Sequence, residues 1–324
     1  MTQLTRRFVL IGAAAAPLGA ALPARAQSFP GTVKLVVPYP PAGSTDAMMR
    51  MIQPALQQRL KSTVIIENKP GASGSIGTGM VAKAPPDGSH WAIVFDNHAA
   101  NPFVLPSMPF DTEKDLLPVL LIGTAPYMVV TAPSKPYQTL ADVIAAAKAK
   151  PNAITYGSVG AGSIGHLAMT LLANRAGVSL VHVPYRGGGP AMNDAIAGHV
   201  EMMIGSVALQ LPQVNAGKVR GLFHTGKGRL AARPDVAAAS ETFPGFEAYA
   251  WWGVFAPAGT PQALIDRMAD DMSACLREER VSKVLVETQQ IDLKLGGPKV
   301  LGAFLAEQMQ TWGKVARDNN IKGS

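Results

Sequence analysis

The sequence predicts a two-lobed α/β protein, in which each lobe is a mainly parallel sheet flanked by helices and two crossing strands form the hinge. Three observations support this fold class. Short β-branched apolar runs alternate with helical patterns in two separate blocks of the chain, as in parallel sheets covered by helices. Long apolar runs at residues 116–132 and 249–256 separate the blocks. The chain after Thr260 is mainly helical.

The first block shows the strand–helix alternation most clearly. Strands are expected at 34–38, 63–67 and 90–96, and helices at 46–61 and 74–84. Asp87-Gly88 predicts a tight turn before the third strand. The apolar run at 116–132 is then expected to form two strands joined at Gly123-Thr124.

The second block repeats the pattern. Strands are expected at 154–159, 180–183, 200–205 and 219–225, and helices at 140–150, 166–176, 188–197 and 211–216. Thr260 and Pro261 predict an N-cap and first position for a helix at 262–279, followed by helices at 281–288 and 298–319. We therefore expect one lobe from 27–125 with 252–324, and the other from 126–251.

Residues 1–26 are typical of a bacterial export signal. Arg6-Arg7 precedes an Ala-rich apolar run, and Ala24-Arg25-Ala26 fits an A-x-A cleavage site. The sequence thus predicts a twin-arginine-type signal cleaved near Ala26 and a mature periplasmic protein of 298 residues. That length is enough for two lobes with cores of their own. No later segment offers about 18 uninterrupted apolar residues, so no membrane span is expected.

Composition excludes several classes of function. The formal net charge of +7 falls to +4 once Arg6, Arg7 and Arg25 are removed, and no basic cluster alternates with aromatic residues, so no nucleic-acid partner is expected. The only cysteine, Cys275, is expected in the core. The sequence has no G-x-S-x-G motif and no H-E-x-x-H motif, so we expect no catalytic residue, metal or cofactor.

The most informative segment is the loop between the first strand and the first helix. After the turn at Tyr39, residues 42–46 (Ala-Gly-Ser-Thr-Asp) lead directly into the helical pattern. Small residues at a helix start leave backbone N–H groups free, and the helix dipole favours an anion there. We expect this loop to form one side of a carboxylate-binding cleft. Asp46 is expected as the N-cap or as a first-turn acid.

A second loop, residues 154–166, also leads from a strand through small residues into a helix. Gly160 and Ser163 lie in its turn, and His166 lies just inside the helix, as a cleft contact or as a packing or capping residue. Two such loops, one in each lobe, would hold the two ends of a small dicarboxylate or amino acid.

A dinucleotide-binding enzyme is the alternative, because Gly160, Gly162 and Gly165 match the G-x-G-x-x-G pattern. That motif requires an acidic residue about 20 positions later to hold the ribose, and none is present. Arg186 could accept a 2′-phosphate, which leaves a periplasmic NADP-type oxidoreductase as the second hypothesis.

Segments along nearly the whole mature chain resemble the substrate-binding proteins of tripartite tricarboxylate transporters, the Bug family. These segments are Val-Pro-Tyr-Pro-Pro-Ala-Gly-Ser-Thr-Asp at 37–46, Glu-Asn-Lys-Pro-Gly-Ala-Ser-Gly at 67–74, Pro-Asp-Gly at 86–88, Asn-Pro at 101–102, Asp-Leu-Leu-Pro-Val at 115–119, Tyr-Gly-Ser-Val-Gly at 156–160 with His166, Val-Pro-Tyr-Arg-Gly at 183–187 and Trp-Gly-Val-Phe-Ala-Pro-Ala-Gly-Thr-Pro at 252–261.

The resemblance implies a type II periplasmic-binding-protein fold and a hinged cleft that binds a solute through its carboxylate. The expected ligand-binding residues are Tyr39, Ala42, Gly43, Ser44, Thr45, Asp46, Asn97, Ser158, Gly160, Ser163, His166, Tyr185 and Ser206. The family usually has Gly-Gly where this chain has Ala42-Gly43, which adds one methyl group beside the amides.

The expected function is that of a monomeric, non-enzymatic periplasmic receptor. It would capture a dicarboxylate, amino acid or aromatic acid and deliver it to the membrane permease subunits of a tripartite transporter. A role as a sensor subunit that feeds a two-component kinase remains a third possibility. The identity of the solute does not follow from the resemblance.

Overall fold

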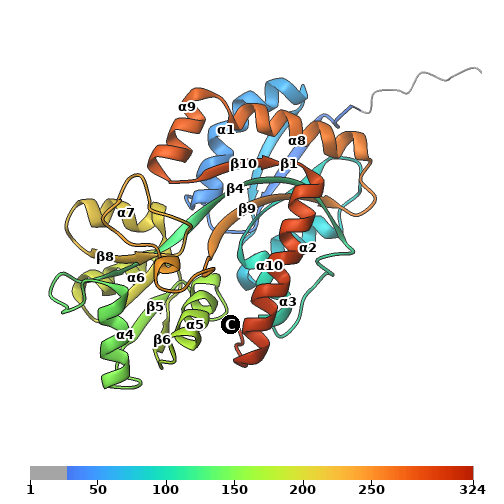
Figure 1. Ribbon diagram of the computed structural model, residues 1–324. Helices are drawn as coiled ribbons and strands as arrows, with labels where there is room; N and C mark the ends of the chain where they lie inside the picture. Colours follow the sequence, from blue (N-terminus) through green and yellow to red (C-terminus); the bar gives the residue numbers. More distant parts are fainter. Residues whose placement is uncertain (1–27, 324) are drawn as a thin grey trace, which may run out of the picture.

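The computed structural model describes residues 28–323, and the expected export signal at 1–26 lies outside this range. Two α/β lobes are connected through a continuous ten-stranded sheet (Figure 1). Along its main path the strand order is β2-β1-β3-β9-β4-β7-β5-β6, with β8 and β10 also paired to β4. The expected fold class, a two-lobed α/β binding protein, is confirmed.

The first lobe has a parallel centre. Strand β1 (Thr32–Val37) lies between β2 (Thr63–Asn68) and β3 (His90–Phe95). Antiparallel strands β9 (Tyr249–Pro257) and β10 (Asp292–Gly296) extend the sheet. The helices of this lobe are α1 (Ser44–Leu60), α2 (Ser75–Ala82), α3 (Asn97–Val104), α8 (Gln262–Leu276), α9 (Glu279–Lys283) and α10 (Pro298–Asp318).

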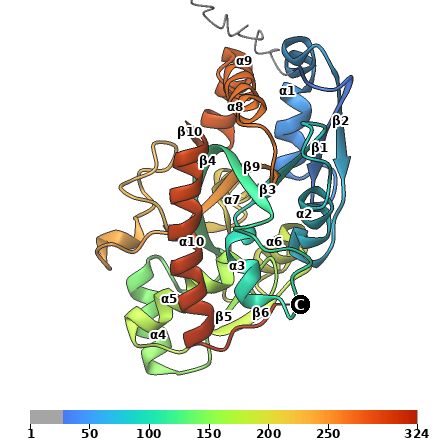
Figure 2. The same ribbon diagram turned by 90° about the vertical axis from the view of Figure 1, so that its right-hand side faces the viewer.

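The second lobe repeats this plan on a smaller scale. Strand β5 (Thr155–Ser158) pairs in parallel with β6 (Val181–Pro184) and β7 (Met202–Ser206), and β8 (Arg220–His224) lies beside β4. Its helices are α4 (Leu140–Ala149), α5 (Ile164–Ala176), α6 (Gly188–Ala197) and α7 (Val207–Asn215). Helix α10 runs from the first lobe down past α3 to α5, so it supports both halves (Figure 2).

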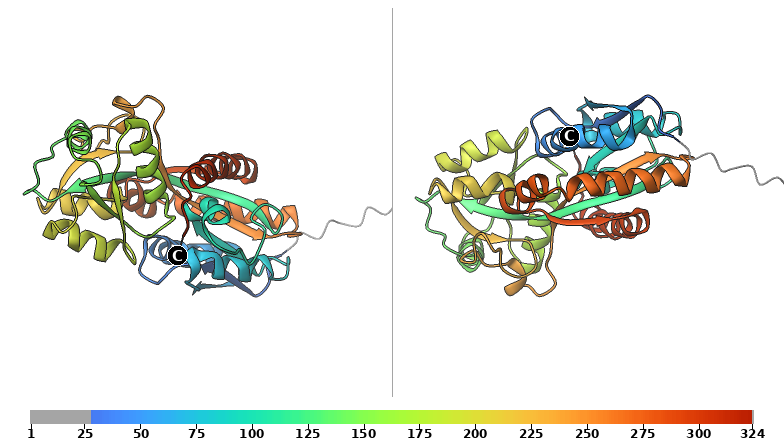
Figure 3. Two further views of the ribbon diagram at one scale, coloured as in Figure 1. Left: turned by 90° about the horizontal axis from the view of Figure 1, so that it is seen from below. Right: turned by 90° about the horizontal axis from the view of Figure 1, so that it is seen from above.

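Strand β4 (Leu116–Thr131) connects the lobes. Its residues up to Pro126 pair with β9, and its residues from Tyr127 onward pair with β7 and β8. It appears in Figure 3 as one long ribbon through both lobes. The prediction of two strands joined at Gly123-Thr124 was therefore wrong. A Cβ on Gly123 would lie 2.6 Å from the Asp292 carbonyl oxygen, so this glycine permits close approach of β10 and marks no turn.

Several predicted helix boundaries need correction. Helix α1 begins at Ser44 instead of 46, and α8 has Pro261 instead of Thr260 at its N-cap position. The predicted helix at 281–288 is the short α9 followed by a π-helical turn at Val284–Thr288. Helix α3 and strand β10 were missed, because Pro102 and the short Asp292–Gly296 run hide their patterns. The expected lobe bounds remain a prediction.

The core is continuous across the two lobes. Trp251 and Trp252 are fully buried, and Cys275 is buried as expected, so that burial raises its thiol pKa to about 11. No helix within residues 28–323 is both long and apolar enough to span a membrane.

Candidate ligand-binding cavity

A cavity of about 660 Å³ lies where the two lobes meet. Ala42, Gly43 and Ser44 line it from the β1–α1 loop, and Ser206 lines it at the end of β7. These four residues belong to the expected ligand-binding set. The remaining wall comes from the end of β3, the hinge strand β4, the starts of α6 and α7 and the turn at 288–289.

Helix α1 directs its N-terminus into this cavity. Gly43 is its N-cap residue, and no side chain of the described residues caps the helix. Within the described part of the chain, the N–H groups of Gly43, Ser44, Thr45 and Asp46 have no hydrogen-bond acceptor. Because the helix has 17 residues, its dipole adds a positive potential at these amides. The start of α1 therefore presents N–H donors and a positive helix end to the cavity, and the expected anion site stays a prediction.

The carboxylate of Asp46 holds this loop in place. Asp46 is a first-turn acid, one of the two expected positions, and Gly43 occupies the N-cap. Its Oδ2 accepts the Ala42 N–H at 2.9 Å, and Arg50 donates to the same carboxylate at 2.9 Å. The hydrogen bond from Arg50 lowers the pKa of Asp46. The Asp46 carboxylate is thus hydrogen-bonded to groups of the protein itself, and Asp46 does not line the cavity.

Ala42 adopts a left-handed conformation with φ of +66°. The left-handed conformation costs an alanine residue about 1 kcal/mol or more, whereas glycine adopts it without strain. The hydrogen bond to Asp46 holds Ala42 in this conformation, and the methyl group stands beside the free amides.

Tyr39, Thr45 and Asn97 support the loop and do not line the cavity. The Tyr39 hydroxyl donates to Asn97 Oδ1 at 2.7 Å and accepts the Phe95 N–H at 2.8 Å. Burial raises the pKa of Tyr39 far above its ordinary value. Thr45 Oγ1 accepts a hydrogen bond from Trp252 Nε1 at 3.1 Å. These contacts fix the loop against β3 and β9.

Asp96 and Tyr127 form a buried pair next to the cavity. The Tyr127 hydroxyl donates to Asp96 Oδ2, and the Tyr127 side chain lines the cavity together with Phe95. Burial raises the pKa of Asp96 to about 8. Desolvation therefore disfavours the charged form of this carboxyl group.

The wall from the second lobe consists of two more helix starts. Gly188 and Gly189 begin α6, and Ala208 and Leu209 lie in the first turn of α7. A Cβ on Gly188 would lie 2.5 Å from Leu209 Cδ2, so a larger residue there would require the Leu209 side chain to move. The sequence analysis predicts a helix from residue 188 but no ligand contact there. Gly-Gly-Gly-Pro at 187–190 is nevertheless the same pattern of small residues before a helix as at 42–46.

In the second predicted loop, residues 154–166, side chains of the loop accept several of its own backbone N–H groups. Ser158 Oγ accepts the Gly160 N–H at 3.3 Å, and His166 Nδ1 accepts the Gly162 N–H at 3.1 Å. Ser163 caps α5 by accepting the His166 N–H at 3.3 Å. The expectation that this loop offers free amides is therefore wrong at these positions, because neighbouring side chains accept their hydrogen bonds.

His166 of this loop packs against His182 of β6 instead of lining the cavity. His166 stacks on His182 at 3.7 Å between ring centroids, and Ser158 Oγ lies 2.7 Å from His182 Nε2. Burial lowers the pKa of each histidine to about 4. Tyr185 donates its hydroxyl to Asp194 Oδ2 at 2.7 Å. Of this region only Val159 contributes to the cavity.

The surroundings of the G-x-G-x-x-G loop also disfavour a dinucleotide. A Cβ on Gly162 would lie 3.0 Å from Val104 and 3.1 Å from Gly323 Cα, and one on Gly165 would lie 3.1 Å from Ile204. The loop is thus covered by α3 and the C-terminal segment, where a pyrophosphate would have to approach its backbone.

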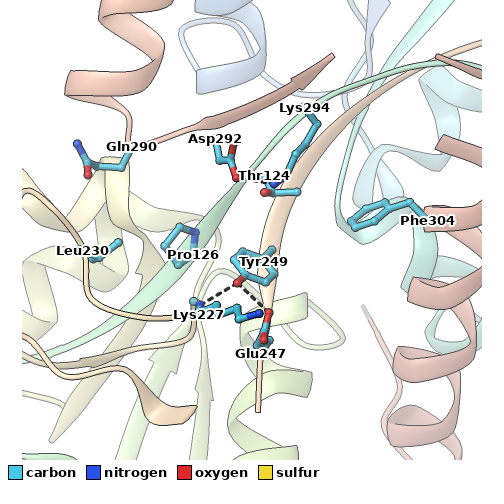
Figure 4. A pocket seen from close by; sticks show the side chains of 11 residues that line it. Thr124, Pro126, Lys227, Leu230, Glu247, Tyr249, Gln290, Asp292, Lys294 and Phe304 are labelled. Carbon is cyan, nitrogen blue, oxygen red and sulfur yellow. Dashed lines mark hydrogen bonds and ion pairs between the residues drawn. The ribbon is translucent and has the colours of Figure 1, made fainter. Parts of the chain in front are cut away.

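A second cavity of about 430 Å³ lies on the other side of the hinge strand (Figure 4). Thr124 and Pro126 of β4 point into it, whereas Tyr127 points into the larger cavity. Lys227 donates its N–H to the Tyr249 hydroxyl at 2.8 Å, and this hydroxyl donates to Glu247 at 2.9 Å. No group of three or more potential metal ligands occurs among the described residues.

Residues 48–321 match the model of the tripartite tricarboxylate transporter family receptor. The chain is 31% identical to Protein BugT of Bordetella pertussis over 326 residues, which covers 99% of each chain. The solved structure of Rpa4515 from R. palustris with adipate has 31% identity and a TM-score of 0.81, covering 90% of this chain and 98% of that one. MatC from Rhodopseudomonas palustris with bound malate has 27% identity and a TM-score of 0.77, covering 88% and 98%.

These comparisons agree with the fold. The family consists of receptors that bind their substrate. The chain belongs to the tripartite tricarboxylate transporter receptor family, the periplasmic binding proteins that include the Bug proteins.

Proposed function

We propose that this protein is a periplasmic receptor that captures a small organic acid in the cavity between its lobes. The observation that carries the proposal is the start of α1, where the N–H groups at 43–46 have no acceptor among the described residues and adjoin a cavity of about 660 Å³. Structures of relatives with adipate and with malate support a carboxylate ligand.

Binding would follow from backbone chemistry alone. A carboxylate at the start of α1 accepts two or more N–H donors, and each charge-assisted hydrogen bond contributes about 1.5–3 kcal/mol. The ligand would also contact the second lobe at α6 and α7 and so favour closure of the hinge along β4 and β9. The closed receptor would then deliver the acid, as a monomer, to the permease subunits of a tripartite transporter.

The first test is identification of the small molecule that co-purifies with the full-length, exported protein by mass spectrometry. Calorimetry on the stripped protein then measures binding of dicarboxylates, amino acids, aromatic acids and NADP. We expect binding of one class of acid with a raised melting temperature and no response to NADP. A response to NADP alone would overturn the proposal in favour of an oxidoreductase.

A further inference from the structure

We infer that the C-terminal segment, residues 319–323, ties the two lobes together and holds the walls of the cavity at the separation at which an acid binds. It is a positioning segment, which contacts both lobes and does not line the cavity. The inference rests on the proposed function, because it concerns the regulation of binding in that same cavity.

The end of α10 sets the course of this segment. Asn320 adopts a left-handed conformation with φ of +51°. Its N–H donates to the Arg317 carbonyl at 3.2 Å, and the Ile321 N–H donates to the Ala316 carbonyl at 2.9 Å. These two hydrogen bonds form a Schellman motif, which ends the helix and turns the chain in a fixed direction. Because Ile321 is also buried, the residues after it leave α10 at a defined place.

The segment is anchored first on the lobe from which it comes. The Gly323 N–H donates to the carbonyl of Val104, at the end of α3, at 2.8 Å. A Cβ on Gly323 would lie 3.5 Å from Val104 Cγ2 and 3.5 Å from Leu105 Cδ2. These are ordinary packing distances, so the segment rests against the end of α3 in the first lobe.

The same segment also contacts the second lobe at two places. Asn174 of α5 donates from Nδ2 to Asn319 Oδ1 at 3.0 Å, while Asn319 donates its own amide to the Val315 carbonyl at 2.9 Å. Gly162, in the β5–α5 loop, lies so close that an added Cβ would be 3.1 Å from Gly323 Cα. In Figure 1 the C-terminus accordingly lies between α5 and α3.

Contact with both lobes couples the segment to the cavity. The β5–α5 loop that meets Gly323 also carries Val159, which lines the cavity from the second lobe. On the first lobe the cavity is lined by Phe95, the last residue of β3, two positions before α3 begins. The segment therefore contacts the elements that carry or adjoin a residue of each wall.

The contacts to the two lobes require that α3 and the β5–α5 loop stay at their present separation. A rotation about the hinge strand β4 that moves the loop away from α3 would break them. They therefore raise the population of the conformation in which both walls are in place. A ligand that needs both walls binds more tightly when this conformation is already populated, because its apparent affinity scales with that fraction.

A short truncation separates this role from folding. Deletion of residues 322–324 removes the Gly323 contacts to both lobes and keeps the Schellman motif and the buried Ile321, so α10 should end as before. Asn174→Ala removes the hydrogen bond between α5 and Asn319, and Asn174 is exposed, so the core is unaffected. Gly323→Ala is the matched control, since it keeps the N–H and its Cβ has room.

Two measurements are made on each chain. Calorimetry on the stripped protein gives the affinities for succinate, malate, adipate, glutamate and benzoate, and the acid that binds the wild type most tightly is compared across the variants. Double electron–electron resonance gives the distance distribution between spin labels on the two lobes. The labels are attached through Gln58→Cys in α1 and Lys148→Cys in α4, both exposed positions, while the buried Cys275 stays unlabelled.

The truncation should weaken binding at least threefold, and the truncation combined with Asn174→Ala at least tenfold. Without ligand, the combined variant should give a broader distance distribution than the wild type. Gly323→Ala should keep the wild-type distribution and an affinity within twofold. Melting temperatures report folding separately, and a fold that is merely weakened would not broaden the distribution below its melting transition.

The outcomes separate the two proposals. A wild-type distance distribution in the combined variant, or an affinity equal to or tighter than that of the wild type, would overturn the inference and leave the receptor function intact. If no acid of any class binds the wild-type protein, the proposed function fails. The distance distributions of the ligand-free chains then still decide whether the segment ties the lobes together.

Discussion

The two loops that look alike in the sequence, at 39–46 and 154–166, differ in where their backbone donors are used. Both lead from a parallel strand through small residues into a helix. The N–H groups at 43–46 of the first loop have no acceptor within residues 28–323 and lie beside a cavity, whereas Ser158, Ser163 and His166 accept N–H groups of the second. Small residues permit an anion site, but nearby side-chain acceptors decide whether the amides remain available.

The largest effect is expected from removing one donor of the first loop. Ser44 is the first residue of α1, and Gly43 before it is extended (φ −74°, ψ 169°), so Ser44→Pro should fold well. It deletes one free N–H, and the affinity for the acid should fall about tenfold to a hundredfold. Calorimetry measures the change. Ser44→Ala keeps the N–H and serves as control; unchanged affinity in Ser44→Pro would refute the amide site.

Removing the support beneath the first loop should have a smaller effect. Asp46→Ala deletes the acceptor that holds Ala42 in its left-handed conformation. We expect about a fivefold loss of affinity, equivalent to about 1 kcal/mol. Ala42→Gly in the same chain should recover part of this loss, because glycine adopts that conformation without strain. Binding affinity and melting temperature are measured for Asp46→Ala and for the double variant with Ala42→Gly. If Ala42→Gly recovers none of the lost affinity, backbone strain at Ala42 does not explain the loss.

The stacked pair of His166, in the second loop, and His182, in β6, should respond to acid. The folded pKa values of His166 and His182 are lowered to about 4, below the ordinary 6.5, so the unfolded chain binds protons first as the pH falls. Their contribution to stability is complete above about pH 6.5 and is lost as the pH falls toward 4. His182→Gln should therefore reduce the drop in melting temperature between pH 7 and pH 5, measured by calorimetric scanning. An equal drop in both proteins would contradict this.

The smallest effect on binding is expected from Ser163→Ala. It removes the side-chain cap of α5 and should cost about 1 kcal/mol of stability. Affinity for the acid should change less than twofold, since Ser163 does not line the cavity. Chemical denaturation and calorimetry give the two numbers. A loss of affinity as large as that of Ser44→Pro would contradict this prediction and indicate that the second loop belongs to the binding site.

Local patterns predicted much of this molecule. The apolar alternation gave most strands and helices, and the run at 42–46 gave the free start of α1. Of the expected ligand-binding residues, Ala42, Gly43, Ser44 and Ser206 line the cavity. Tyr39, Thr45 and Asn97 hold the loop in place, which the sequence could not distinguish from direct contact.

The opposite wall could not be predicted in the same way. Leu209 packs on Gly188, 21 residues away in the sequence. Phe95 and Tyr127 line one cavity only because β3 and β4 belong to one sheet. Such contacts depend on how strands are ordered, and a single sequence does not state that order.

The sequence by itself determined the alternation of strands and helices, the buried Cys275 and the positions where small residues precede a helix, because these depend on near neighbours. Only the tertiary structure decided which of those helix starts share a cavity. An N–H group at a helix start is free or used according to the acceptors within hydrogen-bond reach. Side chains of the second loop itself accept the N–H groups of Gly160, Gly162 and His166, whereas no acceptor among the described residues reaches those at 43–46.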